Sequence, residues 1–238
     1  MLDSPRKILN DVALLNAADI ARALQSLFAL RAHWTPRQSL PFYTLGAASY
    51  LDASGGFAAY RAGAERTNPI LAEHFGWLHD RLCAVVSERV GEEAVCDARL
   101  ALPGFHVFLF DPAIPYPPAS VHYDMQYEPI DWTGIGTPDV TTQLSLTLTL
   151  ALPAAGGGLL VWNINRLDLD RMTPDERRSY TYENRVATFH PYTVGHLVVH
   201  SGHQLHQIAA APDATPDDRR ITLQAHAIRV DGRWLVYW

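Results

Sequence analysis

Apolar residues recur at helical spacing in the first ninety residues of the chain. Between residues 17 and 30 they repeat every three or four positions, at Ala17, Ile20, Leu24, Leu27 and Leu30, which is the period of one helix face. Asn16 precedes this run and is a favourable N-cap. A second helix is predicted from about Pro69 to Val90, because proline is common in a first helical turn and Gly91 stands where a helix would end.

After Gly91 the hydrophobic period changes to two, as in β-strands. The clearest case is 141–152, where four leucines alternate with Gln143, Ser145, Thr147 and Thr149. Further strands are predicted over 98–110, 121–127, 159–163, 185–189, 196–200, 206–209, 220–229 and 233–238, with a polar excursion over 166–185. Helices followed by many short strands predict an α+β fold built on an antiparallel sandwich or barrel. Strand 141–152 would pack helices outside and face a polar lumen inside.

Composition narrows the class of protein. The 238 residues fit one domain, although two small ones remain compatible with the length, and a net charge of −6 leaves no basic footprint for nucleic acid or anionic membranes. Two cysteines do not make a disulfide framework, so we expect a reduced setting. No stretch is apolar enough to span a bilayer, and acidic residues near the N-terminus argue against a secretory signal. These features predict a cytoplasmic protein.

His122 and Asp124 are the first candidate metal ligands. Residues two apart on a strand point to the same face, so an imidazole and a carboxylate would project together. These are two of the three ligands of a facial triad, a geometry that leaves coordination positions open and suits iron(II). Alone, this spacing is a weak signal, because it is common by chance.

A second candidate segment holds four histidines within eleven positions, namely His196, His200, His203 and His206. One metal ion would need only one of them as its third ligand. At least two of the four are therefore interpreted as ordinary surface or core-edge residues.

The third candidate element is the strand that begins at Arg220. Arg220, Thr222, Gln224 and His226 share one face of it. An arginine that points into a polar lumen needs an anionic partner, because burying its charge unpaired is costly. That partner is either a ligand carboxylate, bound in a bidentate fork with help from the Thr222 hydroxyl, or a neighbouring side chain such as Asp217 or Asp218.

Together these motifs resemble the iron(II)/2-oxoglutarate-dependent oxygenases, particularly their prolyl-hydroxylase-like branch. The resemblance covers roughly residues 105–227: His-x-Asp, the glycine turn 156–158 before a strand, Gly-x-Leu-Val-x-His-x-Gly-x-x-Leu-His over 195–206, and Arg-x-Thr over 220–222. It implies a double-stranded β-helix core, of jelly-roll or cupin-like type, over 92–238. The mainly helical region 1–91 would support it, with helices packed on the outer sheet face.

The resemblance also implies a ligand set. His122, Asp124 and His206 match the iron ligands, and His203 is the second choice for the third ligand. Arg220 matches the residue that binds the far carboxylate of the cosubstrate 2-oxoglutarate, with Thr222 as its helper. The four side chains that would line the lumen, as outer support for the metal or as substrate contacts, are Gln126, Gln143, Thr147 and His226. The insertion needed between His122 and His206 would be the polar segment 166–185.

The implied reaction uses dioxygen and 2-oxoglutarate to hydroxylate a C–H bond of a small molecule, such as an amino acid or its derivative. Related halogenases have glycine or alanine where Asp124 stands, so the carboxylate argues against halogenation. The loop 132–139 is a candidate lid, and Asp139, Asp131 and Glu128 are candidate partners for a substrate amino group. Segment 105–110 is interpreted as core.

Three alternatives remain open at this stage. One is a cupin-type metal enzyme without 2-oxoglutarate, in which Arg220 would only form a salt bridge. Another is a metal-free barrel that binds a small ligand. A zinc hydrolase is less favoured, because no general base is suitably placed and Arg220 would have no role.

Overall fold

A computed structural model describes residues 9–37, 41–110, 120–211 and 215–238. Its main helices are α1 (Ala17–Ala29), α2 (Ser49–Asp52), α3 (Phe57–Val90), α4 (Arg166–Leu169) and α5 (Pro174–Glu183). Its strands are β1 (Leu9–Ala13), β2 (Thr35–Pro36), β3 (Phe42–Leu45), β4 (Ala94–Cys96), β5 (Gly104–Leu109), β6 (Pro138–Ala151), β7 (Gly158–Asn165), β8 (Thr188–Pro191), β9 (His196–Ser201), β10 (Gln204–Ile208), β11 (Arg219–Val230) and β12 (Arg233–Tyr237). This element content confirms the predicted α+β class.

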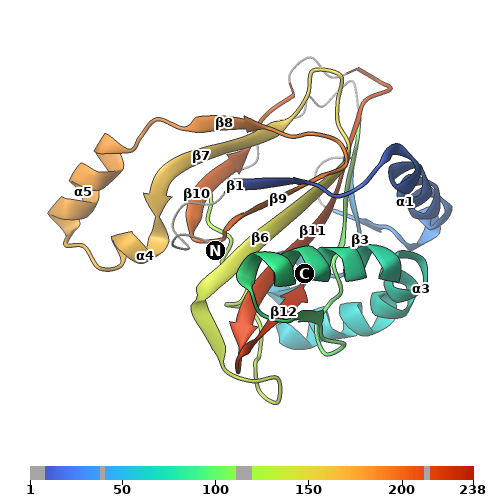
Figure 1. The fold of residues 1–238 in the computed structure, drawn as a ribbon, viewed down its shortest axis with the longest axis horizontal. Coiled ribbons are helices and arrows are strands. Elements are labelled where there is room, and N and C mark those ends of the chain that lie inside the picture. The colour runs from blue at the N-terminus through green and yellow to red at the C-terminus, as the bar shows by residue number, and fades with distance from the viewer. Residues whose placement is uncertain (1–8, 38–40, 111–119, 212–214) are drawn as a thin grey trace.

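Two sheets form the body of the molecule (Figure 1). The large sheet has nine strands in the order β1-β9-β6-β11-β5-β3-β2, with β12 paired to β11 and β4 paired to β12. All of its pairs are antiparallel except β12 with β4. The small sheet has three antiparallel strands in the order β10-β7-β8. The helices α1 and α3 lie beside the large sheet, whereas α4 and α5 extend away from the body next to β7 and β8.

The alternation predicted for β6 is confirmed. Its four leucines are almost fully buried in the main hydrophobic core, where they meet residues of α1 and α3 such as Leu27 and Phe75. The side chains between them are buried as well, but they face the opposite direction and belong to the interior between the sheets. Burial of the leucine face therefore fixes both the register of β6 and the orientation of its polar face.

The helix α3 begins at Phe57, twelve residues before the predicted start, so Pro69 lies inside it. Proline in a helix interior removes one backbone hydrogen bond. The preceding Asn68 compensates through tertiary contacts: its side-chain amide donates to the Leu100 carbonyl at 2.8 Å and accepts from the Leu102 nitrogen at 2.9 Å. The buried face also continues upstream of the proline, through Tyr60, Gly63, Ala64 and Thr67.

The predicted strand over 121–127 is wrong. His122 forms only an isolated antiparallel bridge with His206, through two backbone hydrogen bonds of 3.0 Å. The Asp124 nitrogen then donates to the Gly202 carbonyl at 2.8 Å, and a turn follows in which Glu128 bonds back to Met125. Because two tertiary anchor points replace a regular ladder, the direction of both side chains depends on segment 202–206.

Other differences are local. The polar excursion 166–185 contains α4 and α5, and α5 starts with a capping box between Thr173 and Glu176. The strand predicted over 185–189 is the shorter β8. The N-terminal strands β1 and β3, which join the large sheet, had no clear periodicity in the sequence. Residues 1–8, which entered the localisation prediction, lie outside the described residues, and no helix in the described part is long and apolar enough to cross a membrane.

Candidate metal centre and binding cavity

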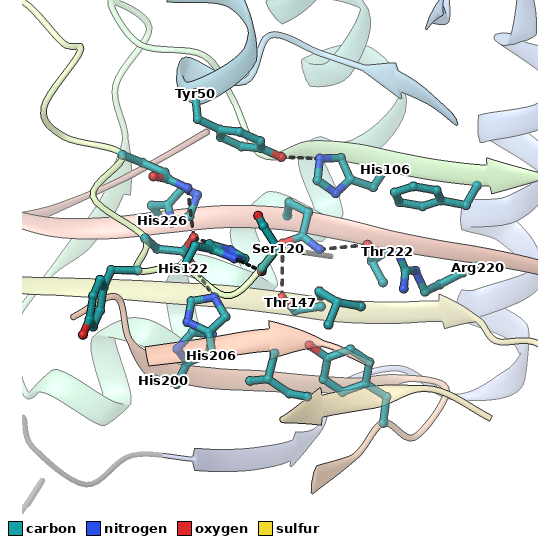
Figure 2. Close-up of a pocket in the computed structure, with 18 of the residues that line it drawn as sticks. Tyr50, His106, Ser120, His122, Thr147, His200, His206, Arg220, Thr222 and His226 are labelled. Carbon is teal, nitrogen blue, oxygen red and sulfur yellow. Dashed lines mark hydrogen bonds and ion pairs between the residues drawn. The ribbon is translucent and has the colours of Figure 1, made fainter. Parts of the chain in front are cut away.

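A cavity of about 390 Å³ lies between the two sheets. The large sheet contributes side chains of β5, β6 and β11 to its wall, and the small sheet contributes Leu159 and Ile208. Residues of segment 120–126 line it as well, and the described lining also includes Phe42, Tyr50, Tyr192, His200 and His206 (Figure 2). The volume is typical of a small-molecule site.

His122, Asp124 and His206 converge at one end of this cavity. One ligand atom from each lies within 4.8 Å of the others. The Nε2 atoms of His122 and His206 are 3.5 and 3.4 Å from the two oxygens of the Asp124 carboxylate. The three residues proposed from the sequence are thus brought together, although His122 and His206 are 84 positions apart (206 − 122).

Hydrogen bonds to the backbone orient both imidazoles. His122 donates from Nδ1 to the Ser120 carbonyl at 2.7 Å, and His206 donates from Nδ1 to the Gln204 carbonyl at 2.8 Å. Each ring therefore carries a proton on Nδ1 and turns its Nε2 toward Asp124. A metal-binding histidine commonly has its other nitrogen fixed in this way.

The charge of Asp124 is favoured by its surroundings. Burial by itself would raise the pKa of Asp124, but the imidazoles of His206 and His122 outweigh burial and hold the pKa well below its usual range. The same contact with Asp124 raises the pKa of His122. Gln126, on the next turn, donates a hydrogen bond of 2.9 Å to the Asp124 carboxylate. An ionised, buried carboxylate between two imidazole nitrogens is a donor set suited to a divalent cation.

Gly202 allows segment 122–124 to approach, and sequence reasoning did not single it out. A Cβ at this position would lie 2.7 Å from the Asp124 carbonyl oxygen and 2.5 Å from the Gln143 side chain. Neither distance is tolerable, and the Asp124 contact is with rigid backbone. Any side chain at position 202 would therefore displace Asp124.

Arg220 lies toward the other end of the cavity, on β11 (Figure 2). Its guanidinium lies over the Phe108 ring, 4.3 Å from the centroid. Beside it, Thr147 donates to Gln224 at 3.1 Å, and Gln224 donates to the Thr222 hydroxyl at 2.9 Å. The structure thus brings Arg220, Thr222 and Thr147 to one wall. The Asp218 carboxylate accepts hydrogen bonds from the backbone of Ala154 and Thr215.

The remaining sequence-selected residues separate into two groups. His226 lines the cavity, 3.5 Å from the Ser145 hydroxyl, and burial lowers its pKa to about 4. Gln143 and His203 do not line it. Gln143 is buried behind Gly202 and accepts from the Tyr237 hydroxyl at 3.1 Å. His203 packs near Tyr127, with ring centroids 6.1 Å apart, and takes no part in the ligand cluster.

Several cavity residues were missed or misread. His200 lies beside His206, with ring centroids 4.6 Å apart, and burial lowers its pKa to about 3. Within segment 105–110 the core interpretation holds for Phe105 and Val107, whereas His106 and Phe108 line the cavity. Their alternation on β5 was visible as period two. Tyr50 and Tyr192 come from positions for which the sequence offered no signal.

The candidate lid and the candidate acidic partners lie elsewhere. Trp132 of loop 132–139 packs on Tyr237, with ring centroids 6.0 Å apart, and Gly136 approaches Asp231 in the β11–β12 turn. Asp139, Asp131 and Glu128 are exposed, and none of them is in the cavity lining. This part of the chain does not cover the described cavity.

Solved structures share this fold. The α-ketoglutarate-dependent epimerase SnoN from nogalamycin biosynthesis has a TM-score of 0.56 at 18% identity, covering 95% of this chain and 82% of that chain. The carbocyclase SnoK from the same biosynthesis has a TM-score of 0.57 at 11% identity, covering 98% and 93%. An N-substituted L-amino acid dioxygenase from Burkholderia ambifaria has a TM-score of 0.53 at 15% identity, covering 96% and 85%.

Sequence comparison alone finds no relatives: no protein-family model matches the chain, and no curated protein matches it either. The structural likeness spans nearly the whole chain despite low identity. The predicted double-stranded β-helix is confirmed, and the chain has the fold of the iron(II)/2-oxoglutarate-dependent oxygenases.

Proposed function

We propose that this protein is an iron(II)- and 2-oxoglutarate-dependent dioxygenase that hydroxylates a C–H bond of a small molecule. One observation carries the proposal: His122, Asp124 and His206 converge in a cavity whose wall also holds Arg220. Two neutral imidazoles and one carboxylate form a facial set that leaves positions open for cosubstrate and dioxygen. The shared fold supports this assignment.

The metal, when bound, supplies the activation of dioxygen coupled to oxidative decarboxylation of 2-oxoglutarate to succinate and carbon dioxide. The protein supplies position. His122 and His206 present Nε2 because their Nδ1 protons are held by backbone carbonyls. Gln126 holds the carboxylate of Asp124. Because Asp124 fills the third ligand position, we assign oxygen insertion to this site and not halogenation.

Arg220 is assigned to the far carboxylate of 2-oxoglutarate. A guanidinium binds a carboxylate through two parallel hydrogen bonds, and stacking on Phe108 limits the orientations that the guanidinium adopts. The Thr222 hydroxyl, held by Gln224, lies on the same wall and adds a donor. The cupin-type alternative would leave this arrangement without a ligand carboxylate to bind.

Hydroxylation is the finer part of the proposal. Structural neighbours are described as an epimerase, a carbocyclase and a dioxygenase, so this fold accommodates several outcomes. Which one follows depends on which C–H bond the cavity places near the metal. Product mass separates the outcomes, since hydroxylation adds one oxygen atom.

Anaerobic titration of the iron(II)-loaded protein with 2-oxoglutarate tests the proposal. We expect a visible metal-to-ligand charge-transfer band in the wild type. His206→Ala should remove the band with the metal. Arg220→Ala should weaken 2-oxoglutarate binding by about 2–5 kcal/mol, the usual effect of truncating one partner of a buried charge pair.

Arg219→Ala is the matched control, because Arg219 is exposed on the opposite face of β11 over the Phe28 ring. It should bind 2-oxoglutarate like the wild type. Bound iron without a band would refute the 2-oxoglutarate assignment and favour a cupin-type enzyme. A protein that binds no iron would refute the whole proposal.

A further inference from the structure

Tyr50 and His106 form a polar pair on the cavity wall, apart from the three candidate ligands (Figure 2). The Tyr50 hydroxyl and His106 Nε2 are 2.5 Å apart. Tyr50 comes from the short helix α2, and His106 comes from β5 in the large sheet. Neither residue has a part in the function proposed above.

The position of Tyr50 is fixed by an ion pair at the end of α2. Arg37 donates two hydrogen bonds to the Asp52 carboxylate, at 2.7 and 2.8 Å, and two more to the Thr44 hydroxyl. Asp52 also accepts from the Ala48 nitrogen at 2.7 Å. Such a bidentate pair with several partners holds its surroundings more rigidly than a single surface salt bridge. The helix that carries Tyr50 is therefore anchored to β3.

A second chain of contacts connects α2 to the metal centre. The Ser49 hydroxyl donates to the Gln126 carbonyl at 3.1 Å, and the side chain of Gln126 donates to Asp124. Tyr50 follows Ser49 directly. Tyr50 is thus linked to the metal centre by its peptide bond to Ser49 and by two hydrogen bonds, from Ser49 to Gln126 and from Gln126 to Asp124.

The pair is uncharged, and it can offer either a hydrogen-bond donor or a hydrogen-bond acceptor. Burial, together with the nearby charge of Arg220, lowers the pKa of His106 to about 3, so the ring is neutral at physiological pH. If Nε2 accepts the Tyr50 proton, the phenol oxygen is left to accept a further hydrogen bond. If Nε2 donates to Tyr50, the phenol proton is left to donate. The pair therefore offers either a donor or an acceptor to a neutral oxygen.

The charges of the described lining are already assigned. Asp124 is its one carboxylate and Arg220 is its one guanidinium or ammonium group. Under the proposed function the first is neutralised by iron and the second by 2-oxoglutarate. A charged group of the substrate inside the cavity would then have no opposite charge in the described lining, which is costly where water is excluded.

The surroundings of the pair are aromatic. Phe42 contacts the edge of His106, with centroids 5.0 Å apart, and stacks on Phe108 at 4.1 Å. Leu159 and Ile208 face the cavity from the small sheet. Such walls favour an apolar ring or chain with a small number of oxygen atoms.

We propose that the Tyr50–His106 pair binds an uncharged hydroxyl or carbonyl group of the substrate, and that the part of the substrate inside the cavity carries no charge. The inference rests on the proposed function, because that function assigns Asp124 and Arg220. It replaces the expectation of amino-group recognition by Asp139, Asp131 and Glu128, which lie outside the cavity lining.

Three probes of equal shape and different charge test this. They are 4-methylbenzyl alcohol, 4-methylbenzylamine (a cation at pH 7) and 4-methylbenzoate (an anion). Their affinities are measured by saturation-transfer NMR on the iron(II)-loaded protein with 2-oxoglutarate, without oxygen. We expect the alcohol to bind at least about tenfold more tightly than either ion, a difference of about 1.4 kcal/mol.

Variants separate binding by the pair from a purely structural role. Tyr50→Phe removes only the hydroxyl, and we expect it to weaken the alcohol about fivefold while the melting temperature and 2-oxoglutarate affinity stay unchanged. His106→Phe should have a similar effect on the alcohol, and His106→Gln, which keeps a neutral donor and acceptor, should restore part of the affinity. Tyr182→Phe, on exposed α5, is the matched control without effect.

The proposal is overturned if either ion binds as tightly as the alcohol, if Tyr50→Phe leaves the alcohol affinity unchanged, or if no probe binds at millimolar concentration. The 2-oxoglutarate titration on the same samples distinguishes failure of the substrate-binding inference from failure of the proposed function. If 2-oxoglutarate does not bind while the alcohol binds in a Tyr50-dependent way, the dioxygenase assignment fails and the neutral subsite stands.

Discussion

The two faces of β6 meet different surroundings within one strand. On one face Leu144, Leu146, Leu148 and Leu150 join the core beneath α1 and α3. On the other face Ser145 contacts His226 and Thr147 contacts Gln224, both across to β11. Both faces are buried, so burial alone does not distinguish them.

The difference lies in what each face contributes. Leucines in the core stabilise the fold by removing apolar surface from water. Truncating one of them loses that burial and leaves a cavity. The polar face gains little net free energy from hydrogen bonds that replace bonds to water. Its contribution is to place groups in the cavity. Changes on the two faces should therefore separate stability from ligand binding.

The largest effect is expected for Asp124→Ala. Under the proposed function this change removes the one carboxylate of the metal centre, and iron(II) binding should fall below detection together with 2-oxoglutarate turnover. Metal content after desalting and succinate release measure this. Asp131→Ala removes an exposed carboxylate outside the cavity lining and should retain both. Full iron occupancy in Asp124→Ala would show that another set of side chains holds the metal.

Leu148→Ala should lower the stability of the fold and leave ligand binding nearly unchanged. Leu148 is completely buried in the main core, and truncation of such a leucine destabilises by about 3 kcal/mol through lost burial and a residual cavity. Urea unfolding measures the loss. The affinity for 2-oxoglutarate at low temperature should stay within about twofold of wild type. A strong loss of affinity would mean that the two faces are mechanically coupled.

Acid should destabilise the helical layer through His79. This residue of α3 is buried and bonds the Pro103 carbonyl at 2.9 Å, and burial lowers its pKa to about 4. Protonation then favours the unfolded chain, whose histidine pKa is about 6.5, so this contribution is complete above that pH and lost as pH falls toward 4. At pH 5 the loss is about 2 kcal/mol.

His79→Gln keeps a donor for Pro103 without the titrating ring. Its unfolding free energy, compared between pH 7 and pH 5, should fall by less than that of the wild type. Equal losses in both proteins would assign the acid sensitivity to other groups, of which His200 and His226 are also buried with lowered pKa values.

Thr147→Val should have the smallest effect. It removes the hydroxyl that donates to Gln224, next to Leu148 but on the opposite face. We expect about 1 kcal/mol of destabilisation, because Gln224 keeps its bond to Thr222. The affinity for 2-oxoglutarate should decrease only a few-fold, compared with the larger loss in Arg220→Ala. An effect as large as that of Arg220→Ala would make Thr147 a direct contact.

Local periodicity was sufficient for β6 and β11, because every second residue of each is fixed by burial. It was insufficient for segment 121–127, whose conformation depends on hydrogen bonds to Gly202 and His206. It also misplaced the start of α3, where Pro69 is tolerated because Asn68 makes tertiary contacts. Local rules fail where contacts between distant residues override them.

The candidate site divides in the same way. His122, Asp124, His206 and Arg220 follow from a recognisable order of motifs, and the structure places them around one cavity. Tyr50 carries no such signal, since it belongs to no motif and a tyrosine in a short surface helix is common in any protein. His203 was a reasonable alternative to His206 by position, but the β9–β10 turn directs it toward Tyr127.

The backbone bridge between His122 and His206 has a consequence for how the centre assembles. Two main-chain hydrogen bonds close a loop of 84 residues (206 − 122) without using any metal-ligand atom. For a flexible chain, the length-dependent part of closing such a loop costs about 4 kcal/mol of entropy. Here folding of the sheets offsets that entropy cost, so His122 and His206 are held close together without help from the metal. Apo-protein should refold without iron and capture it in a single fast step.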